Sequence, residues 1–116
     1  SMSIDPSALD SYREFMGDEA DAFVNQIINT FLVSAPDLIS EMEATLAKDD
    51  LESFVRAAHT LKSNSATFGA TLLSSLCAEM EKEGKSEEVV DLDGKVSRAR
   101  DELALVLEYL KAQITK

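Results

Sequence analysis

The chain has 116 residues, which is enough for one domain with a hydrophobic core and too short for two ordinary domains. Its 22 Asp and Glu residues outnumber 11 Lys and Arg, and the net charge of −11 argues against binding to nucleic acid or to an anionic membrane. The single cysteine, Cys77, excludes an intramolecular disulfide, and with only one histidine, His59, the chain offers no ordinary transition-metal site.

The sequence was searched for membrane-spanning and signal-peptide patterns. No run approaches about 18 apolar residues, so we expect no membrane-spanning helix, and no signal peptide opens the sequence. Ser1 ahead of Met2 resembles a cloning scar. We therefore expect a disordered tail over residues 1–4 and one helical domain over residues 5–116 in a cytoplasmic protein.

The apolar residues recur at spacings of three and four almost throughout, which is typical of an all-α protein. The first predicted helix starts at Asp5-Pro6, where a capping residue precedes a proline, and runs to about Met16. Gly17 then ends it. Its expected buried residues are Leu9, Tyr12 and Phe15.

The second predicted helix is capped by Asp18 and is the longest. Pro36 lies inside it, but the apolar periodicity continues across this proline, which favours one long kinked helix over two. Its apolar face comprises Ala20, Phe23, Val24, Ile27, Ile28, Phe31, Leu32, Ala35, Leu38, Ile39, Met42 and Leu46.

Two shorter helices follow, separated by a turn at Gly69. Asp49-Asp50 supplies the cap of the first, and Gly84 closes the second. The first buries Leu51, Phe54, Val55, Ala58, Leu61, Ser65 and Phe68, and the second buries Leu72, Leu73, Leu76, Cys77 and Met80.

The last predicted helix begins at Ser86 with Glu87 and Glu88, and Gly94 falls on its polar side. Its apolar seam comprises Val89, Leu92, Val96, Ala99, Leu103, Val106 and Leu110. Four such helices with short connections predict an up-and-down antiparallel four-helix bundle, which the short N-terminal helix caps.

His59 lies on the third predicted helix, about 120° from the centre of its apolar stripe, at the border of the solvent face. Arg56 and Lys62 flank it, and the small residues Ser63 and Ala66 follow on the same side. No Asp or Glu occurs from Ser53 to Ala78, where the composition predicts about five. A site for a phosphoryl group should exclude carboxylates and supply cations, which would also keep the imidazole neutral and nucleophilic.

Two plainer interpretations stay open. A lone histidine on a helix flank is usually a polar surface residue, and an acid-free stretch can reflect a largely buried pair of helices. The other candidates are structural: Cys77, Met42 and Met80 as core residues, and Phe31 and Phe68 as packing beneath the active face. The acidic runs from Glu79 to Glu83 and from Asp91 to Asp93 are expected to be solvated helix faces.

The stretch from Arg56 to Ala70, RAAHTLKSNSATFGA, resembles the signature of histidine-containing phosphotransfer (HPt) domains. Carried over by position, the resemblance makes His59 the phosphoacceptor and Lys62 the residue beside the phosphoryl group. Ser63 stands where the family usually has glycine, which bears on access to the imidazole, and Arg56 would dock a partner or stabilise phosphate.

The resemblance implies a phosphorelay intermediate of two-component signalling. His59 would take a phosphoryl group from the phosphoaspartate of a receiver domain and pass it to another receiver, and magnesium would belong to the receiver. The chain has no nucleotide-binding loop, so it is expected to be a monomeric phosphocarrier without cofactor or autokinase activity. A hybrid histidine kinase in cis is a second candidate partner beside the receiver domains.

Two other functions remain open at this point. One is an interaction module that binds receivers without transferring phosphate. The other is the dimerisation and phosphoacceptor segment of a histidine kinase, which typically carries a proline soon after the histidine. Asn64 and Ser65 occupy that neighbourhood here.

Overall fold

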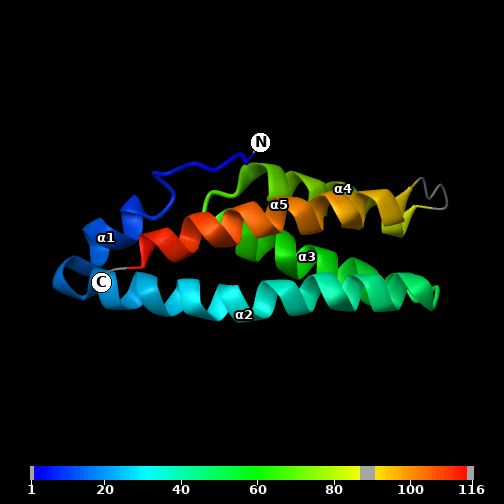
Figure 1. Cartoon of the computed structure of the whole chain (residues 1–116), viewed down its shortest axis with the longest axis horizontal. Coiled ribbons are helices and arrows are strands. Elements are labelled where there is room, and N and C mark those ends of the chain that lie inside the picture. Colours follow the sequence, from blue (N-terminus) through cyan, green and yellow to red (C-terminus); the bar gives the residue numbers. More distant parts are fainter. Residues whose placement is uncertain (1, 87–90, 115–116) are drawn as a thin grey trace.

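A computed structural model describes residues 2–86 and 91–114. In these residues the chain forms α1 (Asp10–Met16), the short 3-10 helix η1 (Gly17–Glu19), α2 (Ala20–Ala47), α3 (Leu51–Thr67), α4 (Thr71–Lys85) and α5 (Leu92–Gln113). Helices α2 to α5 alternate in direction, each packs on the next, and α5 returns to pack on α2 (Figure 1). The all-α, antiparallel four-helix bundle predicted from the periodicity is confirmed.

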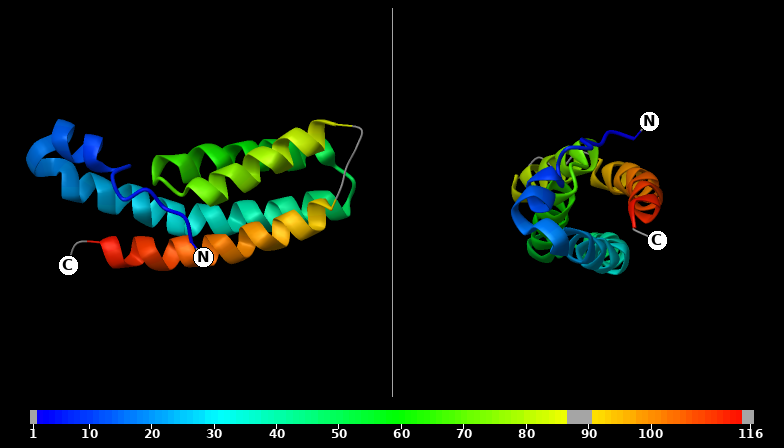
Figure 2. Two further views of the ribbon diagram at one scale, coloured as in Figure 1. Left: turned by 90° about the horizontal axis from the view of Figure 1, so that it is seen from above. Right: turned by 90° about the vertical axis from the view of Figure 1, so that its left-hand side faces the viewer.

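The view down the bundle axis shows the four long helices arranged around a common core (Figure 2). This core is continuous and draws on all four helices, with the most fully enclosed large side chains being Ile28, Ile39, Met42, Phe54, Leu61, Leu73, Met80 and Leu110. Phe31 and Phe68 pack against each other with ring centroids 4.9 Å apart. In the described residues, one chain thus supplies all four long helices of the bundle.

Helix α2 runs through Pro36 as one continuous helix, as the uninterrupted periodicity predicts. The stretch Asp10–Ala47 contains a window with a mean hydropathy of 1.2, long enough to cross a membrane, of which 28% is buried. Our sequence expectation missed this stretch. It is weak support for a membrane span, because a core helix of a helical bundle meets the same two criteria.

The predicted helix ends are wrong at several points near the N-terminus. Asp5 caps a turn instead of a helix, accepting hydrogen bonds from the backbone N–H and hydroxyl of Ser7, and α1 starts only at Asp10. Phe15, expected in the core, is 92% exposed. Gly17 does end α1, with φ of 59°, but η1 then intervenes and Asp18 does not cap α2.

The segment before α1 lies against the bundle instead of forming a tail over residues 2–4. The backbone N–H of Ser3 donates to the Glu102 carboxylate at 3.1 Å, and that of Asp5 donates to the Gly69 carbonyl at 2.7 Å. Met2 and Ile4 are partly buried against the core.

The connection between α4 and α5 also differs from the prediction. Helix α4 continues past Gly84 to Lys85, and α5 begins at Leu92, where the Asp91 carboxylate accepts a hydrogen bond from the backbone N–H of Gly94. The predicted start at Glu87 and Glu88, and the seam residue Val89, lie outside the described residues.

Candidate functional site

His59 sits in the middle of α3, on the side of the helix that the core does not use. The buried stripe of this helix comprises Phe54, Ala57, Ala58, Leu61 and Ser65. The side chain of His59 keeps 58% of its surface exposed. Asp50 caps the helix by accepting a hydrogen bond from the backbone N–H of Ser53, as the sequence predicts. The imidazole is therefore accessible and carried by a well-formed helix.

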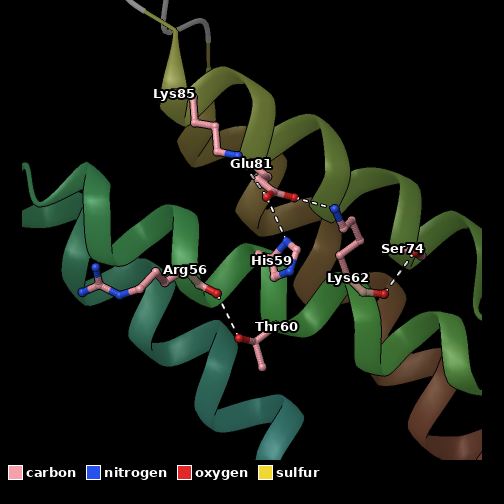
Figure 3. Close-up of polar contacts among 7 residues, drawn as sticks. All are labelled: Arg56, His59, Thr60, Lys62, Ser74, Glu81 and Lys85. Carbon is pink, nitrogen blue, oxygen red and sulfur yellow. Dashed lines mark hydrogen bonds and ion pairs between the residues drawn. The ribbon is translucent and has the colours of Figure 1, made fainter.

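The close approach of α4 to α3 brings a second ionisable group to His59. Gly84 faces Val55, and a Cβ built on this glycine would lie only 2.6 Å from the Val55 Cγ2. Glu81 lies one turn before Gly84 on α4, and His59 lies one turn after Val55 on α3. Because the two helices are antiparallel, Glu81 and His59 therefore lie opposite each other (Figure 3). Gly84 is thus a packing residue rather than the end of the helix.

Glu81 binds three side chains at once. Its Oε2 lies 2.9 Å from His59 Nδ1 and 3.3 Å from Lys85 Nζ, and its Oε1 accepts a hydrogen bond from Lys62 Nζ at 2.7 Å (Figure 3). The residue is only 9% exposed. The hydrogen bond from Lys62, followed by those from His59 and Lys85, outweighs the opposing effect of burial and lowers the pKa of Glu81 to about 2. The carboxylate is therefore ionised at neutral pH.

An ionised carboxylate can only accept hydrogen bonds, so its partner Nδ1 must carry a proton. The neutral ring then has its lone pair on Nε2, which lies on the opposite side of the ring from Glu81 (Figure 3). With His59 neutral, Glu81 and the two lysines sum to one positive charge. The arrangement presents a nucleophilic nitrogen beside cationic groups, as acceptance of an anionic group requires.

The structure brings together only some of the residues that the sequence singled out. Lys62 shares Glu81 with His59, and its carbonyl accepts a hydrogen bond from the Ser74 hydroxyl at 3.1 Å. Arg56 instead turns away from the imidazole and binds Glu52 and Ser53, each at 3.0 Å. Ser63 and Ala66 lie exposed further along α3, so no bulky side chain follows His59 on its own face.

Glu81 was not among the residues predicted for the site, and the prediction that its acidic run is a solvated face is wrong, because Glu81 is buried. The prediction that the site excludes carboxylates is also wrong, because a buried one touches the histidine. A signal was present: Leu73, Cys77 and Glu81 follow one another at intervals of four on the buried side of α4. A glutamate in line with core residues indicates a paired carboxylate.

An apolar groove lies between α2 and α3, beside the helix that carries His59. It has a volume of about 310 Å³, and none of its lining residues is charged: Phe23, Gln26, Ile27, Thr30, Phe31, Ser34, Asn64, Thr67 and Phe68. Cys77 is a buried free thiol whose pKa burial raises to about 12, which confirms it as a core residue. Across the described residues, no group of three or more His, Cys, Asp or Glu side chains could hold a metal ion.

Residues 26–113 match the family described as the Hpt domain. The chain is 30% identical over 108 residues to the phosphorelay protein LuxU of Vibrio cholerae serotype O1, a match that covers 93% of this chain and 87% of that protein. It is 33% identical over 81 residues to the sensor protein TorS of Escherichia coli K12, covering 70% of this chain but only 8% of that much longer protein.

Two solved structures have the same fold. The crystal structure of histidine-containing phosphotransfer protein B from Pseudomonas aeruginosa PAO1 superposes with a TM-score of 0.84 at 25% identity, over 96% of this chain and 93% of that one. The HPT domain of a sensor hybrid histidine kinase from Shewanella gives a TM-score of 0.73 at 21% identity, over 94% of this chain, and supports the fold alone. From the family match, the relatives and the bundle, the chain belongs to the Hpt domain family.

Proposed function

We propose that this chain is a phosphorelay intermediate of two-component signalling in which His59 carries the phosphoryl group. The observation that supports this most strongly is the exposed imidazole whose Nδ1 is bound by the ionised Glu81. This bond directs the lone pair to Nε2, the outward nitrogen. The Hpt family membership and the similarity to a phosphorelay protein support the same role.

The reaction needs one nucleophile and no redox or cofactor chemistry on this chain. The Nε2 lone pair attacks phosphorus in line, the P–O bond to the aspartate of a receiver domain breaks, and the electron pair of that bond returns to the aspartate carboxylate. The reverse displacement by the aspartate of a second receiver breaks the Nε2–P bond. We expect magnesium and the other catalytic groups to come from the receiver.

Lys62 is the cation best placed to stabilise the transferred group. It comes from the next turn of the same helix, and its Nζ is held at the site by Glu81 at 2.7 Å. Lys85 adds a second positive charge from α4. Arg56 points away and is bound to Glu52, so we assign it no direct part in phosphoryl binding.

The groove between α2 and α3 is the docking surface that we propose for the receiver. It is apolar and uncharged in a chain of net charge −11, so an apolar partner surface can pack there without desolvating a charge. Two of its residues, Asn64 and Thr67, belong to the helix of His59. On this proposal, the chain is a monomer in the cytoplasm and its partners are receiver domains.

The test is transfer from a receiver domain that has been phosphorylated beforehand and freed of its donor. The wild-type chain should acquire the phosphoryl group in a form stable to base and labile to acid, as a phosphoramidate is. His59→Gln should acquire none, while keeping the same helical circular dichroism spectrum. Undiminished labelling of His59→Gln would exclude His59 as the acceptor, and tight receiver binding without any transfer would favour a pure interaction module.

A further inference from the structure

Ser63 follows His59 by one turn of α3, and its hydroxyl has no partner among the residues that the structure describes. The side chain is exposed to solvent. We propose that this hydroxyl donates a hydrogen bond to the phosphoryl group carried on His59 Nε2. This inference rests on the proposed function, and it adds a phosphoryl-binding residue to the site.

The helix places Ser63 and Lys62 on opposite sides of His59. At about 100° per residue, Lys62 lies about 60° round the helix to one side of His59, and Ser63 lies about 40° to the other. Lys62 and the Nδ1 edge of the ring share the Glu81 carboxylate, so this edge is on the side of Lys62. Nε2 points away from Glu81 (Figure 3). A group bonded to Nε2 therefore lies on the side of Ser63.

The spacing brings the hydroxyl within reach of such a group. Side chains four residues apart on a helix have Cβ atoms about 5–6 Å apart. The Cα–Cβ bonds tilt toward the helix N-terminus, so the Ser63 side chain leans toward His59. A serine hydroxyl can rotate to aim its proton, and a phosphoryl group presents three strong acceptor oxygens.

The other polar side chains on the Nε2 side of the ring are already engaged within α3. The Arg56 guanidinium is held by two acceptors of its own helix, each at 3.0 Å. The hydroxyls of Thr60 and Thr67 both donate to the carbonyl four residues earlier, at 3.0 Å and 3.3 Å. In the described part of the chain, the Ser63 hydroxyl makes no such bond, so it can turn to a phosphoryl oxygen without breaking one.

The bond that we propose forms only when His59 is phosphorylated. The hydroxyl keeps its proton throughout and donates it to an oxygen that carries negative charge, so the balance of the transfer reaction is unchanged. Because the free histidine offers no such acceptor, the bond stabilises phosphohistidine relative to histidine. Ser63 therefore shifts the phosphoryl equilibrium between a receiver and this chain toward the chain.

The equilibrium constant of transfer measures this contact. At protein concentrations far below the dissociation constant of the complex, it depends only on the separated proteins, so contacts made during docking cancel. Equilibrium can be approached from a phosphorylated receiver and, in the reverse direction, from the chain phosphorylated chemically with phosphoramidate. Ser63→Ala should lower the constant about twofold to tenfold, the size of a typical net hydrogen bond. The variant should fold, because alanine is the best helix former.

Two further variants separate the hydroxyl from the bulk of the side chain. Ser63→Gly removes the Cβ atom as well as the hydroxyl, and its equilibrium constant should fall as far as that of Ser63→Ala. Ser40→Ala makes the same change at an exposed position on α2, and its equilibrium constant should equal that of the wild type. None of these substitutions alters the charge of the chain.

Each outcome decides the inference. An equilibrium constant of Ser63→Ala equal to that of the wild type would overturn it. A higher constant in Ser63→Gly than in the wild type would also overturn it, because Ser63 would then obstruct the phosphoryl group. Slower transfer at an unchanged constant would assign Ser63 to docking and refute the phosphoryl contact. The proposed function fails by a different result, which is labelling of His59→Gln or no label on the wild-type chain.

Discussion

Gly84→Ala should destabilise the bundle, even though alanine is the better helix former. The new methyl group would lie 2.6 Å from Val55 Cγ2, whereas carbon atoms in contact are separated by about 3.5–4.0 Å, so α3 and α4 must move apart by about 1 Å. Overpacking of this kind lowers the free energy of unfolding by about 1–3 kcal/mol, and replacing a glycine inside a helix by alanine raises it by about 1 kcal/mol. With the midpoint of the overpacking range, the free energy of unfolding falls by a net of about 1 kcal/mol, which lowers Tm by about 4 °C.

A cycle with Val55→Ala isolates the contact. Removing the Val55 methyl groups leaves room for the new Cβ, so only the gain in helix propensity remains, and Gly84→Ala should then stabilise the chain by up to about 1 kcal/mol. Urea unfolding of the four proteins, followed by circular dichroism, measures both effects. A Gly84→Ala effect of the same sign and size in the two backgrounds would refute the proposed close packing of α3 on α4.

Three further predictions concern the site. Lys62→Met should slow phosphoryl transfer from a receiver by about tenfold or more, whereas Lys82→Met, an exposed lysine on α4, should leave the rate near wild type. The pKa of Glu81 is lowered from 4.5 to about 2, so the stability that its ionised form contributes is complete above about pH 4.5 and is lost as the pH falls toward 2. In acid unfolding, Glu81→Gln should lack this pH-dependent loss of stability. Thr30→Arg, which fills the groove from an exposed position on α2, should weaken receiver binding but still allow phosphoramidate to label His59. The control Ser40→Arg, on the same helix, should leave both receiver binding and labelling unchanged.

The fold could be predicted because its main determinant is the spacing of apolar residues over whole helices. The periodicity of α2 runs through Pro36 without a break, and the helix does the same. Family membership rested on a local stretch around His59 and Lys62, and it is confirmed. The role of His59 itself stays a prediction until phosphate is mapped on the chain.

The helix ends were less predictable because each rests on one or two residues with more than one use. Asp5 caps a turn and Asp18 caps nothing, although both have the residue type of a helix cap. Gly84 has the residue type of a helix terminator but serves a close helix–helix contact. Only the tertiary arrangement distinguishes these uses.

Glu81 shows the same limit at the site. Its acidic neighbours suggested a solvated face, and its pairing with His59, 22 residues earlier in the chain, depends on how α4 is set against α3. The contact between Val55 and Gly84 is part of that packing, and no local pattern reveals it.

The position of the phosphoryl group tests the central claim most directly. After incubation with a phosphorylated receiver, the chain can be digested at neutral or higher pH and its phosphopeptides fragmented under conditions that preserve P–N bonds. We predict a single phosphorylated residue, His59, with the phosphorus on Nε2 by phosphorus–nitrogen coupling. Phosphate on any other residue, on Nδ1 of His59, or nowhere on the chain would contradict the account.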